Sequence, residues 1–145
     1  MIKFLFYLQS VMVFLCFFSV NGHAGQEDKI TEYGIYDDEQ KLIKQSKIVP
    51  AQQVVRFGFC FEAYVNFDGD KYMLTQSLAH PEILSEGGWP NKGYNVPRKF
   101  KVSNGVASGC VGYNARTKEE APAGEWTFSV SDGSHELLRF IFILQ

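Results

Sequence analysis

One run of alternating residues constrains the fold of this chain more than any other feature. Between positions 55 and 67 all seven odd-numbered residues are apolar, with Phe57, Phe59 and Phe61 at the centre of the run. Every second residue of a β-strand points to the same face, whereas a helix would spread these residues around its axis. The run therefore predicts a long strand over residues 54–67 that buries a phenylalanine-rich face.

The rest of the chain has the pattern of short strands separated by turns. Asp-Gly pairs at 68–69 and 132–133 predict hairpin turns. Residues 82–98 are predicted to form a long loop because they are rich in proline and glycine, and residues 114–125 form a second loop. Further strands are expected at 30–36, 41–49, 71–78, 99–102, 106–113, 126–130 and 136–144. This spacing is typical of an all-β sandwich or small barrel.

The first residues have the features of an export signal. Lys3 precedes an apolar stretch over 4–20, and Gly22 and Ala24 are small residues that suit a signal peptidase. We expect residues 1–24 to be a signal peptide, 25–29 a flexible N-terminus and 30–145 a single domain. The alternative is an uncleaved membrane anchor, for which the apolar stretch is short.

The cysteines predict a disulfide bond. Removal of residues 1–24 takes away Cys16 and leaves Cys60 and Cys110. Two cysteines in an oxidising compartment favour a disulfide bridge. The alternatives are free thiols and a redox pair, and the absence of a CxxC motif argues against the redox pair. Cys60 falls on the polar side of the alternating run, so we expect a cross-strand bridge on a sheet surface, or a bulge at Gly58 that changes the register.

Charge and motifs argue against several classes of function. The formal net charge is −2 and the pI is about 5.9, which argues against nucleic acid or an anionic membrane as a partner. The sequence has no phosphate-binding loop and no zinc-ligand spacing, since His80 and His135 are far apart. We therefore expect no cofactor, no metal site and no catalytic residues.

The best candidate for binding is the segment 87–97. It places Trp89, Lys92 and Tyr94 in a polar, glycine-rich context, where an exposed aromatic ring can stack on a sugar or a peptide. Large aromatic side chains are usually mostly buried, so we favour the alternative that Trp89 folds back and plugs the end of the sandwich. A partner that pairs with an exposed sheet edge is a second mode of binding.

Two other classes of function remain open. Glu62, Glu82, Glu86 and Glu125 could serve a small hydrolase, but that chemistry depends on the separation of two carboxylates, which a sequence does not give. Surface acids in contact with water are the simpler interpretation. A structural or assembly subunit is the third class, and a large exposed apolar patch would indicate it.

Three stretches in this order resemble a family of short exported bacterial domains of unknown function. They are Glu32–Tyr36, Phe57–Phe59 and Gly124–Phe128, and the resemblance covers most of residues 30–144. The last stretch, with the hairpin after it, is also similar to the final strands of extracytoplasmic immunoglobulin-like modules. The resemblance implies a fold and a compartment, with no catalytic residues to carry over.

Taken together, these features predict an immunoglobulin-like β-sandwich of seven or eight antiparallel strands. We expect it to be a periplasmic or secreted, non-enzymatic binding or accessory module. Its partner would be a protein or glycan of the cell envelope, and the chain would not insert into the membrane after the signal is removed.

Overall fold

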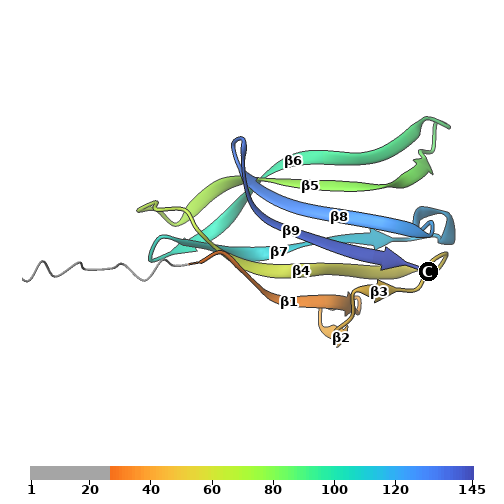
Figure 1. Cartoon of the computed structure of the whole chain (residues 1–145), viewed down its shortest axis with the longest axis horizontal. Helices are drawn as coiled ribbons and strands as arrows, with labels where there is room; N and C mark the ends of the chain where they lie inside the picture. Colours follow the sequence, from red (N-terminus) through yellow and green to blue (C-terminus); the bar gives the residue numbers. More distant parts are fainter. Residues whose placement is uncertain (1–26) are drawn as a thin grey trace, which may run out of the picture.

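The computed structural model describes residues 27–145, so the expected signal peptide lies outside the described residues. Within them the chain forms nine strands and one short 3-10 helix (Figure 1). The elements are β1 (Lys29–Tyr36), β2 (Leu42–Lys44), β3 (Ile48–Val49), β4 (Val55–Tyr64), β5 (Lys71–Leu84), β6 (Pro90–Ser103), β7 (Val106–Ala115), η1 (Lys118–Glu120), β8 (Gly124–Asp132) and β9 (His135–Leu144). The predicted all-β class is confirmed. None of the helical structure in residues 27–145 is long and apolar enough to cross a membrane.

The strands form one hydrogen-bonded sheet that curls over its own core. The strand order is β2-β1-β4-β7-β6-β5-β8-β9-β3, and every pairing is antiparallel except β3 with β9. The two ends of this order, β2 and β3, are separated by residues 45–47 alone, so the curl brings the edges of the sheet close to each other. The sheet has nine strands rather than seven or eight because the polar segment 41–49 divides into β2 and β3.

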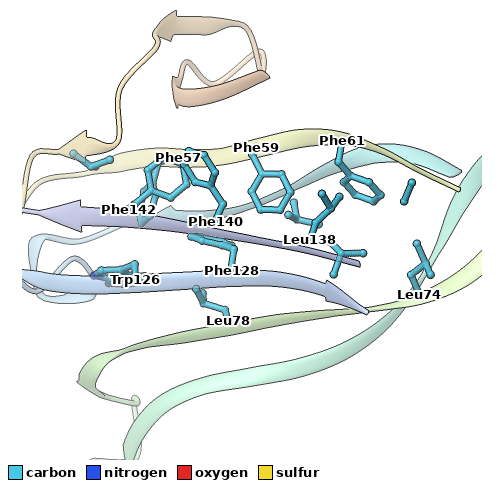
Figure 2. Packing of buried hydrophobic residues seen from close by; sticks show 14 of the residues in the cluster. Phe57, Phe59, Phe61, Leu74, Leu78, Trp126, Phe128, Leu138, Phe140 and Phe142 are labelled. Carbon is cyan, nitrogen blue, oxygen red and sulfur yellow. The ribbon is translucent and has the colours of Figure 1, made fainter. Parts of the chain in front are cut away.

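The core lies between β4 on one side and β8 and β9 on the other (Figure 2). Phe57, Phe59 and Phe61 of β4 are at most 1% exposed and point toward Phe140 and Phe142 of β9. Phe57 contacts Phe142 edge to face, with 5.3 Å between ring centroids. Burial of each such ring stabilises the fold by about 1.5–3 kcal/mol. The alternating run therefore buries the face that the sequence predicts.

The alternation continues past the end of β4. The strand ends at Tyr64, and Phe67, the last member of the run, is 40% exposed. Its ring packs against Tyr72 with 5.1 Å between centroids, at the turn that leads into β5. At the same end of β4, β1 begins at Lys29, which forms an ion pair of 2.7 Å with Glu62.

Cys60 and Cys110 are bonded across neighbouring strands. They are direct partners in the β4–β7 pairing, with an S–S distance of 2.05 Å and a Cα–Cα distance of 3.9 Å. Both side chains lie on the outer face of the sheet, opposite to the phenylalanines. The bridge joins strands of one layer and does not cross the core.

The predicted loop over residues 82–98 is wrong. The structure has a hairpin there, in which β5 continues to Leu84 and β6 begins at Pro90. Proline is tolerated on this strand because none of the described strands pairs with one side of β6 along residues 90–100. Gly93 is required by close packing, since a Cβ atom there would lie 2.0 Å from the carbonyl oxygen of Leu78.

A bulge directs the end of this hairpin away from the sheet. The register of β5 against β6 shifts between Ala79 and Ile83, and β5 pairs with β8 no further than Ala79. Pro81 lies in the bulge and packs so closely on Gly124 that a Cβ atom there would be 2.7 Å from the proline ring. Residues 80–92, which we call the hairpin arm, therefore project as a two-stranded ribbon (Figure 1).

Candidate functional site

The main opening of the fold lies between β6 and β7. These strands pair over three residues each, 101–103 of β6 and 106–108 of β7, and then separate. Beyond this short pairing β6 follows β5 toward the hairpin arm, whereas β7 follows β4 (Figure 1). We call the space between residues 90–100 of β6 and residues 109–115 of β7, together with the loop after β7, the β6–β7 cleft.

Two adjoining cavities lie along this cleft. The larger, of about 790 Å³, is enclosed by the hairpin arm on one side and by residues 117–122 on the other. The smaller, of about 230 Å³, lies over β4 and residues 110–114 of β7, and Arg98 is its contact with β6 among the described residues. Tyr113 lines both cavities, so they adjoin each other at this residue of β7.

A buried polar group connects β5 to the wall of the cleft. Gln76 is 2% exposed and occupies a position of β5 that faces the core. Its side-chain oxygen accepts a hydrogen bond of 2.7 Å from Arg98, and its amide donates to the Tyr94 hydroxyl over 3.3 Å. Because Gln76 orients both side chains, Arg98 and Tyr94 are held in place at the edge of the cleft.

Aromatic rings form the next part of the cleft wall. His80 is 8% exposed, and its ring stacks on Trp126 with 4.8 Å between centroids. Tyr113 packs against the same tryptophan at 4.9 Å. The imidazole Nδ1 lies 2.7 Å from the carbonyl oxygen of Pro81 and donates its hydrogen bond to it.

Burial raises the pKa of both cleft tyrosines above the ordinary value. It raises the pKa of the Tyr94 hydroxyl, and nearby Arg98 and Gln76 offset part of that rise. Burial also raises the pKa of Tyr113, and the negative charge of Glu120 adds to the effect. Both hydroxyls are therefore hydrogen-bond donors at neutral pH.

The two ends of the cleft carry opposite charge. Glu82, Glu86, Glu119 and Glu120 line the larger cavity, and Lys118 is the one lysine or arginine among the described residues of its wall. Arg56 and Arg98 line the smaller cavity, whose described wall contains no carboxylate. A ligand that fills both cavities would need positive charge at the outer end and negative charge at the inner end.

The structure separates the three residues predicted for binding. Trp89 lies at the tip of the hairpin arm and is 76% exposed, so the favoured alternative, in which it plugs the end of the fold, is wrong. Lys92 is on the arm and forms an ion pair of 3.6 Å with Glu82. Tyr94 is half-buried and lines the larger cavity. The predicted segment 87–97 thus contributes Trp89 and Lys92 to the hairpin arm and Tyr94 to the wall of the cleft.

The acidic residues considered for hydrolysis divide into two groups. Glu82 and Glu86 line the larger cavity, but Glu62 and Glu125 line neither. Glu62, on β4, forms an ion pair with Lys29 of β1. Glu125, on β8, accepts a hydrogen bond of 3.3 Å from Thr127 of the same strand. In residues 27–145 no group of three or more histidine, cysteine or acidic side chains could hold a metal ion.

The sequence contained a signal for part of the site. Gln76 is the polar exception on the apolar face of the segment 71–78, and the structure shows that it orients two cleft residues. Arg98, His80 and Tyr113 had no such signal, because they come from three strands that only the sheet topology brings together.

Comparisons with known proteins agree with this architecture. The chain is similar to an immunoglobulin-like protein from Pseudomonas aeruginosa whose crystal structure was determined at 1.50 Å resolution. The two are 25% identical with a TM-score of 0.65, and the similarity covers 84% of this chain and 99% of the other. The predicted immunoglobulin-like fold is confirmed. None of the curated proteins is similar enough to match this chain.

A family model extends the comparison over most of the sequence. The model described as a domain of unknown function, DUF3859, matches residues 18–143. The predicted resemblance to an uncharacterised domain family is therefore confirmed, and the chain belongs to the DUF3859 family.

Proposed function

We propose that this protein is an exported, non-enzymatic binding module, and that the hairpin arm and the β6–β7 cleft form its recognition surface. The observation that carries the proposal is Trp89, which is 76% exposed at the tip of a ribbon that extends beyond the sheet. Leu84, on the opposite strand of the same ribbon, is 66% exposed. Exposed large apolar side chains on one projecting element are typical of a contact surface.

The cleft beneath the arm supports the same function. Its wall combines ordered polar groups with half-buried aromatic rings, which is the composition of many binding sites. Gln76, Arg98 and Tyr94 are already connected by hydrogen bonds, so a ligand would meet a wall that is largely preformed.

Export is supported by the disulfide and by the relatives. A bridge between Cys60 and Cys110 persists in an oxidising compartment and would be reduced in a bacterial cytosol. The similar immunoglobulin-like protein comes from a bacterium. We therefore propose that the module works in the periplasm or outside the cell.

The test is the capture of a partner from the cell envelope by the purified protein. Trp89→Ala should reduce the capture at least tenfold, whereas Ile43→Ala should not, because Ile43 is 64% exposed but lies on β2, away from the arm. Tyr94→Phe, which keeps the ring and removes the hydroxyl, should reduce it less than Trp89→Ala. Equal capture by wild type and Trp89→Ala, or no captured partner at all, would contradict the proposal.

A further inference from the structure

The inner edge of β7 has backbone groups that face no strand within residues 27–145. In an antiparallel pair, partners that are not hydrogen-bonded to each other approach to about 4.5 Å between Cα atoms, against about 5.5 Å for hydrogen-bonded partners. The distance of 3.9 Å between Cys60 and Cys110 identifies them as a non-hydrogen-bonded pair. The N–H and C=O groups of Cys110, and of Gly112 and Asn114 in the same alternation, therefore point away from β4 and into the cleft.

The two edges that border the cleft differ in chemistry. On β6 the free edge contains Pro90 and Pro97, which lack an N–H, and Lys92 and Lys99, which are charged. Prolines and lysines are the residues that protect an edge strand from pairing with another chain. Residues 109–115 of β7 contain neither proline nor a charged side chain. The edge of β7 is therefore the one that can accept a further strand.

The cleft is closed at its inner end. There β6 pairs with β7 at residues 106–108, and the ring of Phe100 lies against Gly109 so closely that a Cβ atom at this glycine would be 2.5 Å from it. A chain that runs along β7 toward this point has to end before Gly109. The cleft thus fits the end of a polypeptide better than its middle.

The charge at the closed end selects which terminus fits. A strand added antiparallel to β7 would run with its carboxyl terminus toward Cys110, where Arg98 of β6 lines the smaller cavity. A parallel strand would instead bring its N-terminal amine to the same guanidinium group. Arginine forms charge-assisted hydrogen bonds with a carboxylate and repels an ammonium group. The antiparallel orientation is therefore favoured.

We propose that the β6–β7 cleft binds the carboxyl-terminal tail of another polypeptide as an added antiparallel strand on β7, with its terminal carboxylate at Arg98. This inference rests on the proposed binding function and names the class of ligand. Main-chain hydrogen bonds to Gly112 and Asn114 supply affinity that depends little on sequence. The acidic outer end, with Glu82, Glu119 and Glu120, favours basic residues upstream in the tail. At about 3.4 Å per residue, those basic residues fall roughly four to six positions before the carboxyl terminus.

Two pools of synthetic hexapeptides test the proposal. Each peptide is acetylated at its N-terminus and has two lysines followed by four random residues, and the pools differ only in ending with a free carboxylate or with a carboxamide. The protein, purified with its disulfide intact, should retain the free-carboxylate pool at least tenfold better, as measured by mass spectrometry of the bound peptides. Equal retention of both pools, or retention of neither, would overturn the proposal.

Variants of β7 test the strand addition itself. Asn114→Pro removes an N–H that points into the cleft and bonds nothing in β4, so the sheet should keep its stability. It should weaken binding of the best retained peptide at least tenfold in fluorescence polarisation, whereas Asn114→Ala, which keeps the N–H, should bind like wild type. Unchanged binding by a folded Asn114→Pro variant would show that no strand is added to β7.

A second variant tests the carboxylate contact without altering the edge. Arg98→Gln should bring the retention of the two pools to a ratio of about one, and Lys99→Gln on the neighbouring outward position should leave the preference intact. A preference that survives in Arg98→Gln would place the carboxylate elsewhere and refute the assignment. If Trp89→Ala abolishes partner capture while Asn114→Pro does not, the proposed function holds and the tail-binding inference fails.

Discussion

Replacing Trp126 with alanine is expected to lower the free energy of unfolding by about 4–5 kcal/mol. The side chain is fully buried, and its ring centroid lies 5.4 Å from that of Phe57 and 4.9 Å from that of Tyr113. Truncation of a buried aromatic to alanine costs about 3–5 kcal/mol, because transfer energy is lost and a cavity remains. The indole N–H also donates to the carbonyl oxygen of Pro122 over 3.2 Å. Its loss leaves that acceptor without a partner, which places the expected cost in the upper part of this range.

Urea denaturation followed by circular dichroism measures this change, and the second tryptophan provides a matched control. Trp89 is 76% exposed, so Trp89→Ala should alter stability by no more than about 0.5 kcal/mol. For a chain of this length the Trp126→Ala change corresponds to a fall in Tm of roughly 12–20 °C. A loss below about 1 kcal/mol for Trp126→Ala, or equal losses for both variants, would refute the placement of Trp126 at the centre of the core. The variant should also loosen the cleft wall, because His80 stacks on the same ring.

Three further predictions concern the disulfide, a close strand contact and alkaline pH. Replacing both Cys60 and Cys110 with alanine should cost up to about 4 kcal/mol, the chain-entropy value for a closed loop of this size, in a denaturation curve compared with that of the oxidised wild type. Gly58→Ala should cost about 1–3 kcal/mol or prevent folding, because its Cβ would lie 2.2 Å from a carbonyl oxygen of β7, and a Tm close to wild type would contradict that contact. Tyr94 and Tyr113 have raised pKa values in the fold, so the stability they contribute is complete below their ordinary pKa of 10.0 and is lost as pH rises beyond it. An ultraviolet titration should show both ionising later than free tyrosine, and the Tyr94→Phe/Tyr113→Phe variant should lose less stability than wild type above pH 10.0.

The sequence alone predicts those parts of the fold that depend on local alternation. Five consecutive odd positions from Val55 to Ala63 are buried, as the period of two predicts, and Trp126, Phe128 and Val130 are all 0% exposed. Whether each of these side chains is buried depends only on its position in the alternation of its own strand. The hairpin turn at Asp132-Gly133, which joins β8 to β9, belongs to the same class, because the turn chemistry involves neighbouring residues. The hairpin predicted at Asp68-Gly69 is wrong, because β4 and β5 pair with other strands and not with each other, and only the sheet topology decides that.

The cleft depends on pairings that no local pattern contains. Arg98, Tyr113 and His80 lie on β6, β7 and β5, and they meet because β6 leaves β7 after a short pairing. Nothing in the residues near Arg98 indicates that its neighbours lie on β5 and β7. What the sequence does contain is Gln76, a polar side chain on an otherwise apolar strand face, and its buried hydrogen bonds to Arg98 and Tyr94 explain that exception.

Residues 82–98 are predicted to form a loop because of their prolines and glycines. The same residues explain why this region of the sheet has an open edge. Pro90, Gly93 and Pro97 have the composition of a loop, yet all three lie in β6. Proline can belong to a strand only where its missing N–H faces no partner, and a strand of this length with two prolines is therefore an edge strand. In the strand order β6 lies between β5 and β7. Where β6 is an edge strand, the facing side of β7 is therefore unpaired with it as well. The conflict between local composition and observed structure thus marks the opening of the sheet, where a partner strand can enter.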